Sequence, residues 1–193
     1  IYHEHLRYYG LKQLVKLFEL YGMEVFDAEI LHAQGGSIRV YAGFKDKYPI
    51  SDSINDILEV EERENLHSLD TWKKFAERVL ENKEKLLSLL ADLKSQNKKI
   101  VGISAPGRST TILNYCNINS ELLDYVTEKS NLKIGKYTPG THIEVVDDEK
   151  LVEDQPDYGL LLSWHLADSI IPKIRKSGFK GKIIVNLPEP KIL

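Results

Sequence analysis

The spacing of apolar residues predicts a helix followed by two β-strands at the start of the chain. Apolar side chains recur every three or four positions over 11–22, the period of one helix face, and Gly22 ends the run. Residues 23–31 and 37–44 are rich in β-formers, and apolar and polar positions alternate in the second run. The intervening Gln34-Gly35-Gly36 suits a hairpin turn. We expect this part, which ends at about residue 47, to be the antiparallel end of an α/β sheet.

A long helix is predicted from Leu69 to Ser95, with Asp70 placed to cap its start. Before it, the polar stretch 45–69 contains a short acidic helical pattern over 54–65. The pattern favours a connector packed between two units, and a coiled-coil dimer arm is the alternative. The apolar positions that keep a spacing of four and three are Trp72, Ala76, Val79, Leu86, Leu90 and Leu93.

From Lys99 onwards, strand and helix patterns alternate, which predicts right-handed crossovers and a mainly parallel sheet. The fold class is therefore expected to be α/β. The predicted strands are 100–103, 142–146, 158–162 and 182–185, and the predicted helices are 110–116, 120–127 and 167–176.

Composition narrows the classes of protein to which the chain can belong. Hydrophobic residues make up 42% and charged residues 28%, as in a globular protein, and no apolar run is long enough for a membrane span. A net charge of −3 gives no reason to expect a nucleic-acid or membrane partner. The single cysteine, Cys116, excludes an internal disulfide and a multi-cysteine zinc site. Without a visible signal peptide, the cytoplasm is the expected location.

The first candidate for chemistry is the cluster Tyr2-His3-Glu4-His5, which directly follows Ile1. Because such a cluster needs an element before it, and the first residue is Ile1 instead of methionine, we expect a missing upstream strand and interpret the chain as a fragment or processed product. The imidazole of His5 can take a proton, Glu4 can orient it, and the phenol of Tyr2 can donate to a developing oxyanion. A polar loop that caps the next helix is the alternative. A metal site is less favoured, because His3 and His5 have no obvious third ligand.

The second candidate is the loop between the strand at 100–103 and the helix at 110–116. Ser104, Ser109 and Thr110 supply hydroxyls, and free amide groups with the helix dipole would favour a phosphate. Arg108 would add a cationic fork. The loop matches neither a Walker nor a GxGxxG pattern, so an ordinary turn with a solvated arginine remains an equal alternative.

A third candidate is the run Lys133 to His142, which contains Lys136, Thr141 and a Pro-Gly turn. These residues fit a loop facing a substrate, although composition alone favours a plain tight turn. Trp164-His165 follows a buried strand at its carboxyl end, where open α/β sheets bind ligands. A lone histidine there is otherwise more often structural.

Together these segments resemble the C-methyltransferases that act on nucleotide-linked deoxysugars. The resemblance extends over nearly all of the chain, and five motifs in the same order carry it. They are Tyr2-His3-Glu4-His5 with Tyr8-Tyr9; Gly35-Gly36-Ser37-Ile38-Arg39; Ala105-Pro106-Gly107-Arg108 leading to Leu113-Asn114-Tyr115; Lys136 to His142; and Pro156-Asp157-Tyr158 before Leu161-Leu162-Ser163-Trp164.

The resemblance implies an N-terminal zinc-binding region, a central Rossmann-type domain for S-adenosylmethionine, and a C-terminal Rossmann-like domain that helps hold the sugar nucleotide. On that map, residues 1–47 are the end of the methyl-donor domain, 48–98 are a helical connector, and 99–193 are the Rossmann-like substrate-binding domain. The zinc ligands and the donor loop would lie upstream of Ile1, so the resemblance implies a fragment that neither binds the donor tightly nor turns over alone.

The resemblance also implies roles for individual residues. Catalysis falls to His5 as the base that removes the proton next to the ketone, Tyr2 as the group that stabilises the enolate, and Glu4 as the group that orients the base or the sugar. A site between two domains would exclude water from the enolate. The residues implied to bind the nucleotide-diphosphate sugar are Arg39, Ser104, Arg108, Ser109, Thr110, Asn114, Lys136, Thr141, His142 and His165.

The chain departs from the family's usual residues at three places. Arg108-Ser109 stands where lysine and glycine are common, His165 where asparagine is common, and Gln34 where histidine is common. These departures bear on the sugar and the nucleotide, which the sequence leaves undetermined together with the methylated carbon and the oligomeric state. Two other functions stay open, a non-catalytic module that binds nucleotide sugars and a methyltransferase for a non-sugar acceptor.

Overall fold

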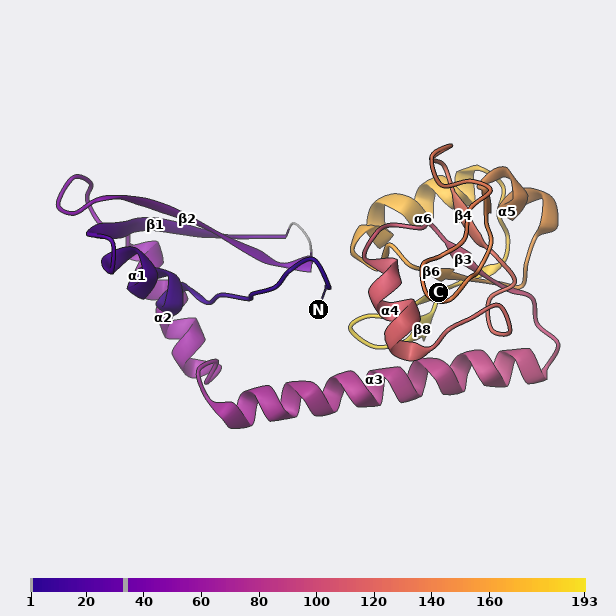
Figure 1. The fold of residues 1–193 in the computed structure, drawn as a ribbon, viewed down its shortest axis with the longest axis horizontal. Helices are drawn as coiled ribbons and strands as arrows, with labels where there is room; N and C mark the ends of the chain where they lie inside the picture. The colour runs from indigo at the N-terminus through magenta and orange to yellow at the C-terminus, as the bar shows by residue number, and fades with distance from the viewer. Residues whose placement is uncertain (1, 33–34) are drawn as a thin grey trace. The chain divides into compact units, whose positions relative to one another are not determined.

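The computed structural model describes residues 2–32 and 35–193 and divides them into two compact units (Figure 1). One unit comprises residues 5–77, and the other comprises 78–193 together with the segment before His5. The first contains a two-stranded antiparallel sheet and the second a six-stranded, mostly parallel sheet. The predicted α/β class is therefore confirmed, whereas the family's domain limits at residues 47 and 98 stay a prediction.

Two positions that entered the sequence-based predictions lie outside the described residues. Ile1 is the residue upstream of which the methyl-donor loop is expected, and Gln34 belongs to the predicted hairpin turn. The expected upstream strand and donor loop therefore stay predictions.

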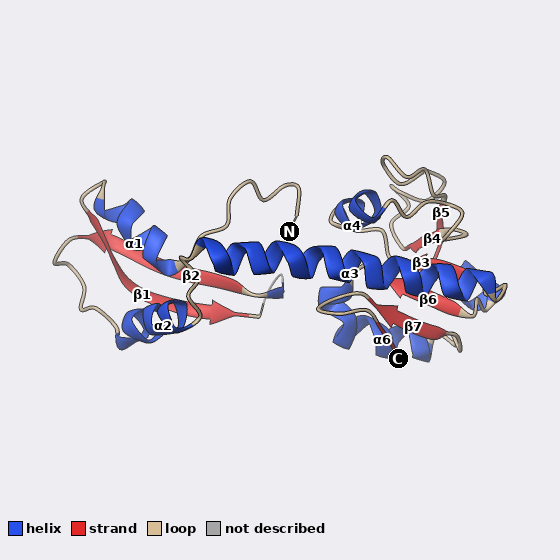
Figure 2. Ribbon diagram, turned by 90° about the horizontal axis from the view of Figure 1, so that it is seen from below, coloured by secondary structure: helices blue, strands red, loops and turns tan. Residues whose placement is uncertain are grey.

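The first unit is a β-hairpin with two flanking helices (Figure 2). Helix α1 (Leu11–Glu19) precedes strands β1 (Met23–Leu31) and β2 (Ser37–Phe44), which pair antiparallel from Met23↔Phe44 to Leu31↔Ser37. Helix α2 (Asp52–Arg63) follows, with the Ser51 side chain as its N-cap. The predicted helix and the antiparallel pairing of the two predicted strands are confirmed.

A small apolar core holds this unit together. Leu11 of α1, Val25 and Ala28 of β1, and Ile54 and Ile57 of α2 are buried against one another. Because each helix contributes only one or two of these residues, neither would bury its apolar face without the hairpin.

A glutamate from α2 caps the start of α1. The N-cap residue of α1 is Gly10, which has no side chain to accept a hydrogen bond. Instead, Glu61 accepts from the backbone N–H of Leu11 through Oε1 and from that of Lys12 through Oε2, the latter at 3.2 Å. A Cβ on Gly10 would lie 2.7 Å from Glu61 Oε1, so the glycine permits this close approach. The side chain of Glu61 is 9% exposed, and its carboxylate also lies 3.5 Å from His67 Nε2.

Helix α3 (Leu69–Ser95) matches its predicted limits, but its cap does not match. Ser68 Oγ accepts from the backbone N–H of Asp70 at 3.2 Å, so the serine caps the helix and Asp70 occupies its first turn. In the C-terminal half, Leu86, Leu90 and Leu93 are buried in the core of the α/β unit. Because these leucines pack inside the α/β unit, they are not available to a coiled-coil seam.

The α/β unit has strand order β5-β4-β3-β6-β7-β8, with only β8 antiparallel. Helices α3 and α4 cover one face of the sheet, and α5 and α6 cover the other (Figure 1). The strands are β3 (Ile100–Ile103), β4 (Val126–Glu128), β5 (Val145–Asp147), β6 (Tyr158–Leu161), β7 (Lys182–Val185) and β8 (Lys191–Ile192). The helices are α4 (Ser109–Cys116), α5 (Glu149–Asp154) and α6 (Ala167–Lys176), with a 3-10 turn, η2 (Trp164–Leu166), before α6.

The order of strands runs outward from β3 to β5 on one side and from β6 to β8 on the other. Chain order therefore reverses between β3 and β6, as in doubly wound nucleotide-binding folds. In such sheets the loops at the carboxyl ends of the two strands at the reversal form a crevice for ligands. The expected Rossmann-like sheet is thus present, and its topology makes the loops after β3 and β6 the candidate ligand site.

The helix predicted at 120–127 is wrong. The backbone makes one turn, in which Leu122 and Leu123 donate to the Asn119 carbonyl, and then enters strand β4. Tyr125, Val126 and Thr127 are all buried, because helices cover both faces of the sheet. A short segment with apolar residues on both sides of Asp124 fits a buried strand as well as a helix.

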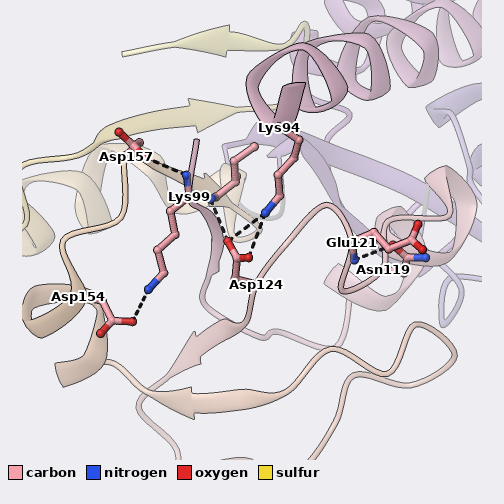
Figure 3. A network of polar contacts seen from close by, with 8 residues as sticks. Lys94, Lys99, Asn119, Glu121, Asp124, Asp154 and Asp157 are labelled. Atoms are coloured by element: carbon pink, nitrogen blue, oxygen red, sulfur yellow. Dashed lines mark hydrogen bonds and ion pairs between the residues drawn. The ribbon is translucent and has the colours of Figure 1, made fainter. Parts of the chain in front are cut away.

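Charged side chains fix the loops at the amino ends of three parallel strands (Figure 3). Asp124, before β4, accepts from the backbone N–H of Ile100 at 3.2 Å and from Lys94 Nζ at 3.0 Å. Asp157, before β6, accepts from the backbone N–H of Lys99 at 2.9 Å, and Lys99 Nζ donates to Asp154 at 2.7 Å. This network lies at the opposite strand ends from the ligand crevice, so we assign it a structural role.

Acid should destabilise the α/β unit through this network. Bonding to the Lys99 side chain lowers the pKa of Asp154, and the Lys99 backbone N–H lowers the pKa of Asp157, each below the ordinary 3.8. Carboxylates with depressed pKa values stabilise the folded state above pH 3.8, and that contribution disappears as the pH falls through their folded pKa values. Urea unfolding of a Trp72→Phe chain, in which Trp164 reports on this unit alone, should show a lower free energy of unfolding in acid. In a Lys99→Met chain the free energy of unfolding should fall less between neutral pH and acid. An unchanged pH dependence in Lys99→Met, equal to that of Lys180→Met, would refute this account.

Candidate functional site

Two serines join the loops at the reversal of strand order. Ser104 follows β3, Ser163 follows β6, and their Oγ atoms lie 2.8 Å apart. Ser104 has a positive φ of 70°, an uncommon conformation for a residue with a side chain, and it turns the chain sharply out of the strand. The predicted site residue Ser104 therefore lies in the crevice at the reversal of strand order.

An ion pair from outside this loop holds its backbone. Ala105 donates its N–H to Glu128 Oε2 at 3.2 Å, and its carbonyl accepts from Lys133 Nζ at 2.7 Å. Lys133 Nζ and Glu128 Oε2 are themselves 3.1 Å apart. Burial favours the protonated acid, but the bonds from Lys133, Lys129 and Ser130 outweigh it and lower the pKa of Glu128. The carboxylate stays charged near neutral pH and fixes the loop between β3 and α4.

The start of α4 is more fully bonded than the sequence suggested. The backbone N–H groups of Ser109, Thr110 and Thr111 each donate to a carbonyl three residues earlier, at 2.9–3.2 Å. Ser109 Oγ donates to the carbonyl of Pro106 at 2.7 Å, and Ser109 is buried. The expected cradle of free amide groups is therefore not formed by these three residues, and Ser109 closes the turn. An anion at this place would be attracted by the dipole of α4 and by the positive charge of Arg108.

The segment before His5 packs on this loop through Tyr2 and Glu4. The guanidinium carbon of Arg108 lies 5.3 Å from the ring centroid of Tyr2. A Cβ on Gly107 would lie 2.9 Å from the Tyr2 phenol oxygen and 3.8 Å from Glu4 Oε1, so the glycine leaves room for the phenol at this place. Loss of hydration, a hydrogen bond with Glu4 and the charge of Glu4 raise the pKa of Tyr2, and Arg108 opposes them. The phenol therefore stays protonated at neutral pH, ready to donate a hydrogen bond.

His165 lies near the same arginine, in the turn η2 after β6. Burial, followed by the positive charge of Arg108, lowers the pKa of His165 below its ordinary value. Its Nδ1 atom is buried, and the part of the chain that the structure describes offers it no hydrogen-bond partner. The imidazole is therefore neutral near pH 7 and retains a nitrogen with unused hydrogen-bonding capacity.

Removing the charge of Arg108 should raise the pKa of His165. In an Arg108→Met chain the second cause of the depression is gone while burial remains, so the pKa should move only part of the way back to its ordinary value of 6.5. NMR titration of the His165 ring measures the change directly. Lys176→Met, which removes a positive charge from the last turn of α6, is the control. Equal shifts in the two variants would show that Arg108 does not act on His165.

The loop 136–142 is tied to α4 by Asn114. The Nδ2 group of Asn114 donates to the carbonyl of Pro139 at 2.9 Å and to that of Thr110 at 2.8 Å. Gly140 has a φ of 79°, and a Cβ there would lie 2.0 Å from Asn114 Oδ1. The second and third candidate segments of the sequence therefore lie side by side.

Within the 136–142 loop, one predicted site hydroxyl is already engaged. Thr141 Oγ1 lies 2.8 Å from Thr138 Oγ1, which also accepts from the backbone N–H of Ile143 at 2.9 Å. Thr138 is buried, so this pair of hydroxyls shapes the loop. The side chains of Lys136 and His142 are exposed on the same loop.

Two predicted site residues belong to the other unit. Arg39 forms a cross-strand ion pair with Glu29 at 2.9 Å, and Tyr41 donates to the same carboxylate at 2.7 Å. His5 is exposed, with its ring 6.0 Å from that of Tyr8. The structure therefore brings together Tyr2, Glu4 and the residues around Arg108, and the roles of His5 and Arg39 stay predictions.

A cavity of about 690 Å³ opens at the carboxyl ends of β3, β4 and β5, on the face covered by α5 and α6. Its wall includes Ser104, the carboxylates of Glu128 and Asp148, and the apolar Ile170 and Ile174. Burial raises the pKa of Asp148 above its ordinary value. The volume is in the range of small-molecule sites, so the crevice has room for a ligand beside Ser104.

The described residues contain no cluster of three or more histidine, cysteine or acidic side chains that could hold a metal ion. A zinc site elsewhere in a longer protein stays a prediction. Among the helices that the structure describes, none is both long and apolar enough to cross a membrane.

Sequence reasoning did not predict the parts played by Glu128, Lys133, Ser163 and Thr111: it gave no role to Glu128, Ser163 and Thr111, and it placed Lys133 in a loop facing a substrate. The first three position the loop after β3, and Thr111 contacts His3 through its hydroxyl at 2.9 Å. The acidic residue at the end of β4 offered one signal, because in nucleotide-binding sheets of this type the strand after the first βα unit often ends near a functional carboxylate. That signal was lost when residues 120–127 were interpreted as a helix.

Comparisons with known proteins identify the family of the chain. Residues 32–188 match the family model described as the C-methyltransferase C-terminal domain. The chain is also 29% identical over 197 residues to the C-methyltransferase NovU of Streptomyces niveus. That alignment covers all of this chain and 46% of NovU, so the chain spans about half the length of this relative. The match covers most of the chain, which therefore belongs to the C-methyltransferase C-terminal domain family.

Proposed function

We propose that this chain is the C-terminal part of an enzyme that transfers a methyl group from S-adenosylmethionine to a carbon next to a ketone in a nucleotide-linked deoxysugar. Membership of the C-methyltransferase C-terminal domain family supports the reaction class. Because the chain matches 46% of NovU, we assign the activity to a full-length protein that also carries a methyl-donor domain.

The observation that carries the proposal is the packing of Tyr2 and Glu4 on Gly107 and Arg108, beside the reversal of strand order. A protonated phenol, a carboxylate and a guanidinium meet there, next to a crevice of the kind that binds nucleotides in related sheets. Enolate formation needs a hydrogen-bond donor for the oxyanion and fixed charge nearby, and these residues supply both.

Each residue of the segment 2–5 has a distinct proposed role. His5 takes the proton from the carbon next to the ketone, because an imidazole is an effective base at neutral pH. Tyr2 donates its phenol hydrogen to the oxygen that becomes negative, and its raised pKa keeps that hydrogen in place. Glu4, hydrogen-bonded to Tyr2, orients the phenol and the sugar.

We assign no residue of this chain to the methyl donor. The loop after β3 has a single glycine, Gly107, and its helix amides are bonded within the turn, so it does not suit a nucleoside-type cofactor held by a glycine-rich loop. S-adenosylmethionine, when bound, supplies the electrophilic methyl group that the sugar carbon receives. Its binding site is proposed to lie in the methyl-donor domain, in a loop upstream of Ile1.

The sugar nucleotide is proposed to bind at the carboxyl ends of the parallel strands. Arg108, the dipole of α4 and the exposed Lys136 would attract the diphosphate, and the neutral His165 and Asn114 would hydrogen-bond to the sugar or the base. The cavity beside Ser104 would accommodate part of the ligand. Ser109 and Thr141 act indirectly, by shaping the two loops, and Thr110 contributes at the start of α4.

Incubation of the full-length protein with S-adenosylmethionine and a panel of keto-deoxysugar nucleotides tests the proposal. Mass spectrometry should find one added methyl group on at least one member of the panel, bonded to carbon. A thermal-shift panel on this chain should show stabilisation by nucleoside diphosphates and their sugars. Methylation of a non-sugar ketone alone would favour the alternative acceptor class. Stabilisation by sugar nucleotides with no methyl transfer would favour a non-catalytic binding module.

A further inference from the structure

We propose that Thr111 is a positioning residue that anchors the catalytic segment, so that Tyr2 and Glu4 face the loop at Gly107. This inference rests on the proposed function, because it assigns Thr111 a part in the same reaction. It concerns a residue of α4 that would touch neither the sugar nor the methyl donor.

One hydroxyl holds both the backbone and the side chain of His3. Thr111 Oγ1 lies 3.4 Å from the backbone nitrogen of His3 and 2.9 Å from its Nδ1 atom. Because a β-branched threonine has few rotamers in a helix, its hydroxyl is a fixed point from which a neighbouring chain can be oriented. This contact joins His3 to Thr111 at the start of α4, although the two residues are 108 positions apart in the sequence.

A threonine hydroxyl can accept one hydrogen bond while it donates another. Because Thr111 Oγ1 accepts from the His3 amide, we infer that it donates its own hydrogen to His3 Nδ1. The ring then carries its proton on Nε2, which lies 3.9 Å from Glu4 Oε1. The Nε2–H group of His3 therefore faces the Glu4 carboxylate, which also bonds to Tyr2.

The neighbours of His3 show what the anchor positions. The Tyr2 and His3 rings pack edge to face with centroids 4.8 Å apart, and Tyr2 lies against Arg108. Tyr2 and Glu4 both approach Gly107, as the distances to a Cβ there indicate. If the hydroxyl were removed, the half-exposed His3 would lose two contacts, and Tyr2 and Glu4 would sample orientations away from the loop.

Thr111→Val tests the anchor, since it keeps the shape of the side chain and removes the hydroxyl, while Thr111→Ser keeps the hydroxyl. Nitrogen NMR of the His3 ring in this chain should report an Nε2–H tautomer in the wild type and in Thr111→Ser, and a mixture in Thr111→Val. In the full-length protein, kcat should fall about 10-fold or more in Thr111→Val with KM nearly unchanged, and Thr111→Ser should restore it. Thr71→Val, in the first turn of α3, is the matched control.

The two readouts separate this inference from the proposed function. Unchanged His3 signals in Thr111→Val would overturn the anchor, as would altered signals with a wild-type kcat. If the wild-type protein transfers no methyl group, the proposed function fails. The NMR result then decides alone whether Thr111 holds the segment.

Discussion

Replacing His5 with glutamine in the full-length protein should lower kcat for methyl transfer by about 10²–10⁴-fold, the usual contribution of a general base. Glutamine keeps much of the size and polarity of the side chain but cannot take up the proton. Because the sugar nucleotide would be held by other residues, KM should change little. Steady-state kinetics with the keto-sugar nucleotide that the protein methylates measure both constants.

The matched control for this variant is His32→Gln, which replaces an exposed histidine that has no proposed role. It should retain the wild-type kcat. The pH profile adds a second criterion, since kcat/KM should have an acidic limb that reports the catalytic base. A His5→Gln variant that retains this limb and more than half of the wild-type kcat would exclude His5 as the base.

Replacing Glu61 with alanine should destabilise the hairpin unit by about 2–4 kcal/mol, since it removes a helix cap and leaves buried donors without an acceptor. The backbone N–H groups of Leu11 and Lys12 both donate to this carboxylate, and Leu11 is fully buried. His67 Nε2 would also lose its neighbouring charge. Urea unfolding of a Trp164→Phe chain, in which Trp72 is the remaining tryptophan and belongs to this unit, measures the effect.

Glu62→Ala provides the control for Glu61, because the neighbouring side chain is 74% exposed and forms a surface ion pair with Lys12 at 3.5 Å. Such pairs contribute about 0–1 kcal/mol. Glu61→Gln should fall between the two, since its amide oxygen can still accept one of the two backbone hydrogen bonds. If Glu61→Ala is no less stable than Glu62→Ala, the carboxylate does not cap α1.

Long periodic elements could be predicted from the sequence, and short buried ones could not. The limits of α3 and of strands β1 and β2 follow directly from the spacing of apolar residues. Strand β4 has only three residues, Val126, Thr127 and Glu128, so no period distinguishes it from a helix. Helix α5 has six residues and buries only Leu151, and β8 has two exposed residues. Neither has enough residues to produce a pattern.

The sequence predicted which residues belong to the candidate site better than it predicted which of them are in contact. Residue types and resemblance singled out Tyr2, Glu4 and Arg108, which lie together. The bond between Ser104 and Ser163 links positions 59 apart, and the clamp of Glu128 and Lys133 on Ala105 depends on the strand order. Local sequence contains no information on such pairings. The expectation of free amides failed for a different, local reason, because the turn closed on its own carbonyls.

Hydrogen exchange into the substrate tests the central claim most directly. The full-length protein is incubated in heavy water with the keto-sugar nucleotide that it methylates and without the methyl donor, and NMR follows the carbon that receives the methyl group. We predict that the wild-type protein exchanges deuterium into that position, that Tyr2→Phe does so about 10²–10³-fold more slowly, and that His5→Gln does not do so detectably. Exchange at the wild-type rate in both variants would contradict the account, because the proton would then leave without the imidazole and the phenol.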